Sequence, residues 1–189
     1  MIPELEGSIM EAFNSDSVDF VLQLVNCTGK LHPESVAAQL CRKLPFLYTG
    51  YREYCDTHRI KDIIGTIQLY AYPANLFSRR TRDITVVNMF THDHYCDAPD
   101  HVREKYLPCE FTDCLKQFEC TACRRYFNKN GRYPVVAMPY HIGCSKYGGG
   151  DWDLDVRWVL RSYLLKGIRI RCYRLSNTTE TQTDNNQED

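Results

Sequence analysis

A glycine-rich segment towards the carboxyl end of the sequence has the residue types that bind phosphate. The glycine triplet at 148–150 follows an apolar run at 134–138 and precedes a helix-like pattern at 153–166. Glycine lets backbone N–H groups approach a ligand closely, and the start of a helix carries unpaired N–H donors with partial positive charge. Asp151 has a side chain suited to capping that helix. The segment therefore predicts either a phosphate-binding turn or an ordinary connection between a strand and a helix.

A second group of candidate residues consists of histidines and cysteines, the side chains that zinc prefers. Those between positions 92 and 123 are His92, His94, Cys96, His101, Cys109, Cys114, Cys120 and Cys123. Cys120 and Cys123 form a CxxC pair, but the pair lies inside a predicted helix and the sequence holds no second one. Because structural zinc sites usually combine two such pairs, we expect no metal and keep a zinc site as the alternative.

Three further reactive side chains come at the ends of predicted strands. Cys27 and Cys144 have the chemistry of a nucleophile, yet neither has a histidine and an aspartate at a recognisable catalytic spacing. His141 lies at the end of the strand around 135–138, where it lines a cleft or sits on the rim of the fold. We therefore do not expect either thiol to act as a nucleophile.

Composition limits the classes of protein to which the chain can belong. Its 189 residues are 43% hydrophobic with a net charge of −1, which is typical of one globular domain without general affinity for nucleic acid or acidic membranes. No secretory signal and no stretch of transmembrane length is visible, so we expect a cytoplasmic or nuclear protein with reduced thiols. We place the domain at 1–175, followed by a polar, disordered tail at 176–189.

Strands and helices are expected to alternate along the domain. Apolar runs and alternating patterns predict strands at 19–26, 63–72, 83–90, 135–138 and 168–173. Helical spacing predicts helices at 36–44, 46–55, 111–127 and 153–166. Thr112 is the expected N-cap of the third helix, and Asn130-Gly131 is expected to end it. This order predicts an α/β domain with a central, partly parallel sheet.

The order of several motifs resembles the macro domain family, whose members bind ADP-ribose. The sequence is most similar to the branch that contains the terminal ADP-ribose protein glycohydrolase and related phage and viral proteins. The resemblance covers roughly residues 5–175. It rests on Gly7-Ser-Ile9, Leu24-Val-Asn-Cys-Thr-Gly29, Val87-Asn-Met-Phe-Thr-His92, Ile142-Gly-Cys144 and Gly149-Gly-Asp-Trp152, among which the segment from Ile142 to Trp152 is the most specific.

This resemblance implies a three-layer α/β/α domain with a central mixed, partly parallel sheet and a ligand cleft at the carboxyl ends of the strands. It places Ser8 and Ile9 beside the adenine, and Asn26 and Cys27 beside the distal ribose. The residues that it assigns to the diphosphate are Gly143, Cys144, Gly148, Gly149, Gly150 and Asp151. By the same resemblance His92 is the catalytic acid or base and Asn26 orients the ribose hydroxyls. No cofactor is implied.

Four features depart from the family pattern. Ser8 replaces a frequent aspartate, and His92 stands where the glycohydrolase branch has a lysine. The loop after Gly29 lacks the usual glycines and instead holds Pro33 and Glu34, which remove a donor and add a negative charge near the expected ribose. Lys146 lies in a glycine loop that is one residue longer than usual.

Three functions fit these residues, of which the first is the leading expectation, the second its alternative and the third more distant. The first is binding of ADP-ribose, or of an ADP-ribosylated protein or nucleic acid, with hydrolysis of the ADP-ribosyl linkage. The second is a non-catalytic module that reads or sequesters ADP-ribose or another NAD-derived nucleotide. The third is a zinc-stabilised interaction protein that has kept the fold and lost the ligand.

Overall fold

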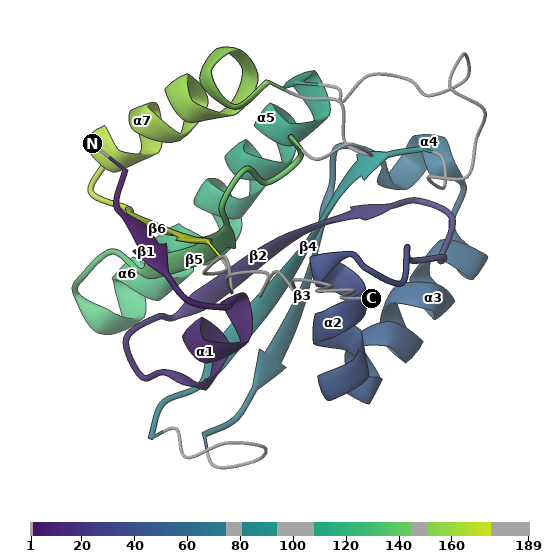
Figure 1. The fold of residues 1–189 in the computed structure, drawn as a ribbon, viewed down its shortest axis with the longest axis horizontal. Helices are drawn as coiled ribbons and strands as arrows, with labels where there is room; N and C mark the ends of the chain where they lie inside the picture. Colours follow the sequence, from purple (N-terminus) through teal and green to yellow (C-terminus); the bar gives the residue numbers. More distant parts are fainter. Residues whose placement is uncertain (1, 75–80, 94–107, 145–150, 175–189) are drawn as a thin grey trace, which may run out of the picture.

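The computed structural model describes residues 2–74, 81–93, 108–144 and 151–174, along which strands and helices alternate (Figure 1). Within these residues the strands are β1 (Glu4–Glu6), β2 (Phe20–Asn26), β3 (Ile67–Tyr72), β4 (Ile84–His92), β5 (Val135–Pro139) and β6 (Arg169–Arg174). The helices are α1 (Ile9–Asn14), α2 (Val36–Lys43), α3 (Pro45–Thr57), α4 (Ile60–Ile63), α5 (Pro108–Phe118), α6 (Arg124–Asn130) and α7 (Trp158–Leu165). A π-helical segment at Glu119–Cys123 joins α5 to α6, and another at Trp152–Arg157 leads into α7.

The strands form a single sheet in the order β1-β6-β5-β2-β4-β3. Every neighbouring pair is parallel except β3 and β4, which are antiparallel. The sheet is therefore mixed, as the sequence predicts. Because five strands run in the same direction, their carboxyl ends meet at one edge of the sheet and their amino ends at the other.

Helices cover both faces of this sheet, which makes three layers (Figure 1). On β2, Leu22 packs in a cluster with residues of α5 and α7, whereas Val21 packs in a second cluster with residues of α1 and α2. This alternation follows from the period of two along a strand. A third cluster, which includes Phe90 and Tyr51, lies between the sheet and α2, α3 and α4.

Most predicted elements are confirmed, and two boundaries were wrong. The strand predicted from position 63 begins only at Ile67, because Gly65 has a positive φ of 76° and turns the chain after α4. Thr112 is not an N-cap, since α5 already begins at Pro108, where the fixed φ of proline suits the first turn. Gly131 does end the helix before it, in the left-handed conformation.

Three short elements, β1, α1 and α4, were not predicted. Ser8 caps α1 and exchanges two hydrogen bonds with Glu11 as a capping box. The predicted polar tail at 176–189 lies outside the described residues. Among the residues that the structure describes, no helix is both long enough and apolar enough to cross a membrane.

Candidate functional site

The two predicted catalytic residues lie side by side at the carboxyl edge of the sheet. Asn26 ends β2 and His92 ends β4, and the backbone N–H of Cys27 donates to the carbonyl of His92 at 2.8 Å. The register between these strands shifts at Asn26, so that it pairs with His92 and Thr91 is an extra residue of β4. Such bulges re-aim side chains and are frequent beside functional sites. The edge thus brings together the residues to which the resemblance assigns the distal ribose.

Internal hydrogen bonds hold the side chain of Asn26, which is 8% exposed. Its Oδ1 accepts from the backbone N–H and the hydroxyl of Thr28, both at 2.8 Å, and from the Tyr51 hydroxyl at 2.8 Å. Its amide nitrogen donates to the Lys30 carbonyl at 2.6 Å. The side-chain oxygen of Asn26 is therefore fully used by contacts within the fold. The amide nitrogen of Asn26 has a second N–H, and this is the donor that can reach a ribose hydroxyl. Its predicted role in orienting the ribose stays a prediction.

Tyr51 is a site residue that the sequence did not reveal. It is fully buried in α3, and its hydroxyl also lies 3.0 Å from the carbonyl oxygen of Asn26. Burial raises the pKa of Tyr51 well above its ordinary value, so the hydroxyl stays protonated and donates. A tyrosine in a helical pattern carries no mark of this contact, since the partner lies 25 positions away.

Replacing Tyr51 with phenylalanine is expected to lower the free energy of unfolding by about 0.5–1.5 kcal/mol, the usual net value of one hydrogen bond. Thr28 still holds Asn26 in this variant, so the fold is retained. Urea denaturation measures the change. Tyr48→Phe is the matched control, because Tyr48 lies partly exposed on the same helix, and it should shift the midpoint little. Equal shifts in both variants would contradict the role given to Tyr51.

The two thiols at this edge are poor nucleophiles. Cys27 is 2% exposed, and burial, with smaller effects of Cys55 and Asp93, raises its pKa to about 12. Burial, with Asp151 and Asp155 as further causes, raises the pKa of Cys144 to about 11. Both thiols are therefore protonated near neutral pH, whereas nucleophilic cysteines need a depressed pKa.

The residues predicted to contact adenine lie where β1 turns into α1. The backbone N–H of Gly7 donates to the carbonyl of Arg174, at the end of β6, so this turn belongs to the same edge. The hydroxyl of Ser8 accepts from the backbone N–H of Glu11 at 3.1 Å, and the side chain of Ile9 is buried. The Ser8 side chain therefore caps α1 and the Ile9 side chain packs it into the core. Their contact with adenine stays a prediction.

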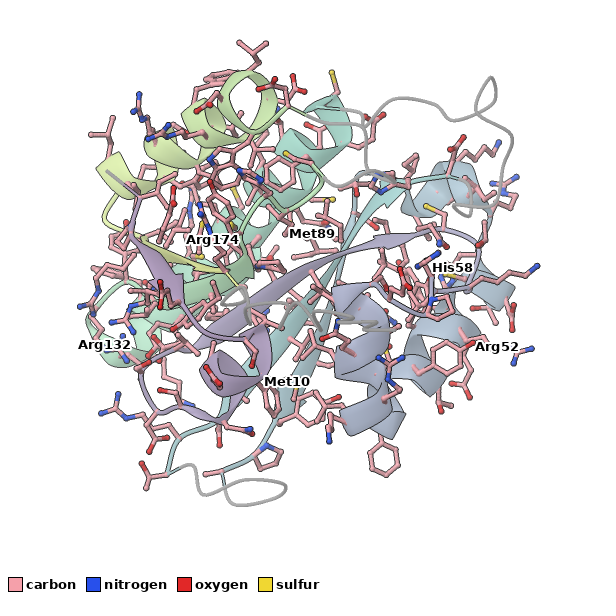
Figure 2. The ribbon with its side chains drawn as sticks, in the orientation of Figure 1. Met10, Arg52, His58, Met89, Arg132 and Arg174 are labelled. Atoms are coloured by element: carbon pink, nitrogen blue, oxygen red, sulfur yellow. The ribbon has the colours of Figure 1, made fainter. Side chains whose placement is uncertain are left out.

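An aromatic stack follows β5 at the same edge. The rings of Tyr140 and His141 are parallel to within 24°, with centroids 3.8 Å apart, and the guanidinium of Arg174 lies 3.9 Å from the Tyr140 centroid. Arg174 is labelled in Figure 2. His141 is exposed and has a positive φ of 54°, and its ring centroid lies 5.4 Å from that of Trp152. His141 therefore lies on the rim of the fold, which is one of the two positions that the sequence predicted for it.

Asp151 caps the helix as predicted, with a consequence for phosphate binding. Its carboxylate accepts from the backbone N–H groups of Asp153 at 2.9 Å and Leu154 at 2.8 Å. Two donors of the helix start are thus occupied by a carboxylate, and Asp153 and Asp155 add further negative charge. Donors for a diphosphate must then come from the turn itself. Gly143, with a φ of 76°, and Cys144 are described, whereas Gly148, Gly149 and Gly150 lie outside the described residues.

Comparison with known proteins identifies the fold. The sequence matches no protein-family model and no curated protein. Among solved structures, the macrodomain of Mycobacterium tuberculosis DarG aligns with 93% of this chain and 98% of its own, at 17% identity and a TM-score of 0.65. The macrodomain of Thermus aquaticus DarG aligns over the same shares, at 20% identity and a TM-score of 0.62. The chain has a macrodomain fold.

A third solved structure carries a ligand. Thermosipho africanus DarTG in complex with ADP-ribose aligns with 84% of this chain and 38% of its own, at 18% identity and a TM-score of 0.61. The macrodomain fold confirms the predicted three-layer α/β/α architecture with its mixed sheet. At these identities the likeness concerns the fold.

The divergent loop of this macrodomain fold, residues 30–35, is joined to α2 by hydrogen bonds. The Arg42 guanidinium donates to the carbonyl of Pro33 at 2.9 Å, and Ser35 caps α2 by accepting from the N–H of Ala38. Glu34 is exposed and lies in the turn that leads into α2. The loop therefore serves as a helix start, and it carries a carboxylate where the family pattern has glycines.

The alternative of a zinc site gains no support from the part of this macrodomain fold that the structure describes. Within it, no group of three or more histidine, cysteine or acidic side chains is placed to hold a metal. Cys120 is exposed while Cys123 is fully buried, so the two thiols of the CxxC face different surroundings. His94, Cys96 and His101 lie outside the described residues.

Proposed function

We propose that the chain binds ADP-ribose, free or attached to a protein or nucleic acid, at the carboxyl edge of its sheet and hydrolyses the ADP-ribosyl linkage. The observation that carries the proposal is the pairing of Asn26 with His92 at adjacent strand ends of a macrodomain fold. A solved structure of similar fold is a complex with ADP-ribose, which supports the choice of ligand.

The proposed hydrolysis requires an acid or a base at the carboxyl edge of the sheet. Hydrolysis needs either a proton delivered to the leaving acceptor or a proton removed from an attacking water. An imidazole can do either near neutral pH, because its ordinary pKa lies close to 6.5. Thr91, which is fully buried, places its hydroxyl oxygen 2.9 Å from Nδ1 of His92 and so fixes the ring. In the proposed role the imidazole of His92 transfers this proton at the bond next to the distal ribose.

A non-catalytic reader is the second candidate, and two specific observations favour it. Glu34 brings a carboxylate into the loop after β2, and the oxygen of Asn26 is committed to Thr28 and Tyr51. Both features leave binding of the nucleotide possible. The first adds a negative charge near the expected ribose, and the second leaves Asn26 without a free oxygen to act on the linkage. The two candidates share the ligand and differ in turnover alone.

Binding of ADP-ribose is expected to be clearly tighter than binding of AMP in calorimetric titrations. The reason is the second phosphate, which the resemblance assigns to the glycine segment at 148–150, since charge-assisted hydrogen bonds from backbone N–H groups contribute roughly 1.5–3 kcal/mol each. Gly149→Val should weaken binding of ADP-ribose by blocking approach of the backbone.

The matched control for that variant is Gly131→Asn, at a helix end with open space around it. Asparagine tolerates the left-handed conformation of Gly131, so the fold should persist and the affinity should not change. Absence of heat and of a thermal shift at millimolar ADP-ribose would overturn the proposal that ADP-ribose is the ligand.

A further inference from the structure

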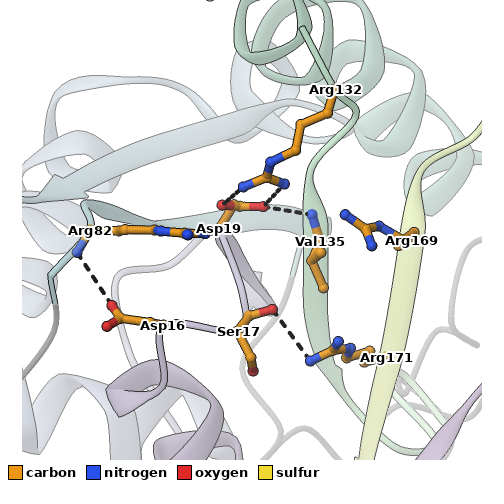
Figure 3. Close-up of a pocket in the computed structure, with 8 residues that line it drawn as sticks. All are labelled: Asp16, Ser17, Asp19, Arg82, Arg132, Val135, Arg169 and Arg171. Atoms are coloured by element: carbon orange, nitrogen blue, oxygen red, sulfur yellow. Dashed lines mark hydrogen bonds and ion pairs between the residues drawn. The ribbon is translucent and has the colours of Figure 1, made fainter. Parts of the chain in front are cut away.

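A pocket lined by arginines lies at the opposite edge of the sheet, where the strands begin. Its volume is about 210 Å³, and Figure 3 shows the side chains that surround it. It is lined by Asp16, Ser17, Asp19, Arg82, Arg132, Val135, Arg169 and Arg171. We call it the amino-edge arginine pocket. Four guanidinium groups meet two carboxylates here, although the whole chain has a net charge of −1.

Both carboxylates of the pocket are already engaged. Asp19 accepts a bidentate pair from Arg132, at 2.9 and 3.0 Å, together with the Tyr126 hydroxyl and the N–H of Val135. Asp16 accepts from the backbone N–H and the hydroxyl of Thr81. Neither carboxylate is therefore available to neutralise the arginines that project from β6.

Those two arginines, Arg169 and Arg171, have no carboxylate partner among the described residues. Among the described residues, the one hydrogen bond given for these two side chains is donated by Arg171 to the carbonyl of Ser17, at 3.3 Å. They stand two positions apart on β6, so both project from the same face of the strand. Figure 3 shows them on one side of the Asp19–Val135 contact and Arg82 on the other. The cations thus converge on a shared space, which β6 lines with Arg169 and Arg171.

The pocket has the chemistry and size for a phosphate or diphosphate group. Guanidinium forks match the oxygens of phosphate in bidentate geometry. A volume of about 210 Å³ equals roughly seven water molecules at about 30 Å³ each, but is below the roughly 300–1,000 Å³ of pockets for whole small molecules. The space therefore suits an anionic group better than a nucleoside.

This pocket is separate from the site proposed for ADP-ribose. Asp19 precedes β2 and Asn26 ends it, and seven residues of strand span roughly 20 Å. We propose that the amino-edge arginine pocket binds a phosphate or diphosphate group independently of the carboxyl-edge site. That group comes either from a free anion or from the backbone of a nucleic acid.

The test measures binding of pyrophosphate to the full chain by calorimetry at low ionic strength, with and without saturating ADP-ribose. The expected result is saturable binding that ADP-ribose leaves unchanged, with a dissociation constant raised at least tenfold in Arg169→Gln/Arg171→Gln. The matched control is Arg125→Gln/Arg161→Gln, which removes the same charge from two exposed arginines on α6 and α7 and should change the constant less than twofold.

Three results would overturn the proposal: no saturable binding at millimolar pyrophosphate, equal weakening in both double variants, or displacement of pyrophosphate by ADP-ribose. Melting curves of both double variants verify that the fold is intact. A ten-nucleotide thymidine strand, followed by fluorescence anisotropy, distinguishes the two sources. Binding that competes with pyrophosphate and is lost in Arg169→Gln/Arg171→Gln indicates a nucleic-acid backbone, whereas binding of pyrophosphate alone indicates a free anion.

Discussion

Replacing His92 with alanine is expected to slow the release of ADP-ribose from a modified acceptor by about 10²–10⁴-fold, the usual contribution of a general acid or base. The affinity for ADP-ribose should stay within a few-fold, because the resemblance places the contacts to adenine and diphosphate on other segments. The measurement is single-turnover release from ADP-ribosylated protein and ADP-ribosylated DNA, alongside calorimetric binding.

The control for this variant is His58→Ala. His58 is an exposed histidine after α3 whose ring stacks on Tyr54, and it is labelled in Figure 2. Its loss should leave release unchanged. The pH dependence of the rate adds a readout that a merely structural role would not move, since His92→Ala should remove the part of the pH profile that depends on an acid or base at this position. Wild-type protein that binds ADP-ribose but releases none would make the chain a reader, and equal release by His92→Ala would move the chemistry away from this residue.

Removing the carboxylate of Asp19 is expected to have the largest effect on stability. Asp19 is 6% exposed, and its loss leaves Arg132, Tyr126 and the N–H of Val135 without their shared acceptor. Breaking a buried pair costs about 3–5 kcal/mol, and we expect about 3 kcal/mol for Asp19→Ala because Arg132 is 36% exposed and can be solvated. Urea denaturation measures this loss. Asp113→Ala, which breaks an exposed pair with Lys116, should cost less than about 1 kcal/mol, and an equal cost would contradict the argument.

The same carboxylate makes stability depend on pH in a defined direction. Burial raises the pKa of Asp19, but hydrogen bonds from Arg132, Tyr126 and Val135 outweigh it, so the pKa lies below its ordinary value near 3.9. Such a group contributes stability that is fully present above pH 4 and is lost as the pH falls through the lower, folded-state pKa. Melting temperatures between pH 5 and 2 should therefore fall more steeply for wild type than for Asp19→Asn. Parallel curves would exclude Asp19 as the source.

Local patterns predicted the parts of this fold that local chemistry determines. The cap at Asp151, the left-handed end at Gly131 and the buried strand β2 each follow from residues within a few positions of one another. The segment Ser8-Ile-Met-Glu11 carries the signature of a capping box and would have revealed α1. β1 gave no signal, because it is three residues long and exposed throughout.

The sites were harder to predict because strand pairing assembles them from distant segments. The contact of Tyr51 with Asn26 depends on the packing of α3 against the end of β2, which no spacing in the sequence encodes. The amino-edge arginine pocket joins Asp19 to Arg132 and Val135, more than a hundred positions later in the chain. In the sequence, Arg169 and Arg171 have the pattern of a solvated strand face, and only the parallel pairing of β5 with β6 turns that face into the wall of a pocket.

The pairing of β1 with β6 has a consequence for synthesis on the ribosome. Among the described strands β1 pairs with β6 alone, and the N–H of Gly7 donates to the carbonyl of Arg174. During synthesis β1 therefore stays unpaired until β6 has been made. Until residues 169–174 emerge, β5 is an open edge with unpaired backbone groups, which invites association with other nascent chains. The turn that holds Ser8 is thus fixed in place only when translation of the domain is complete.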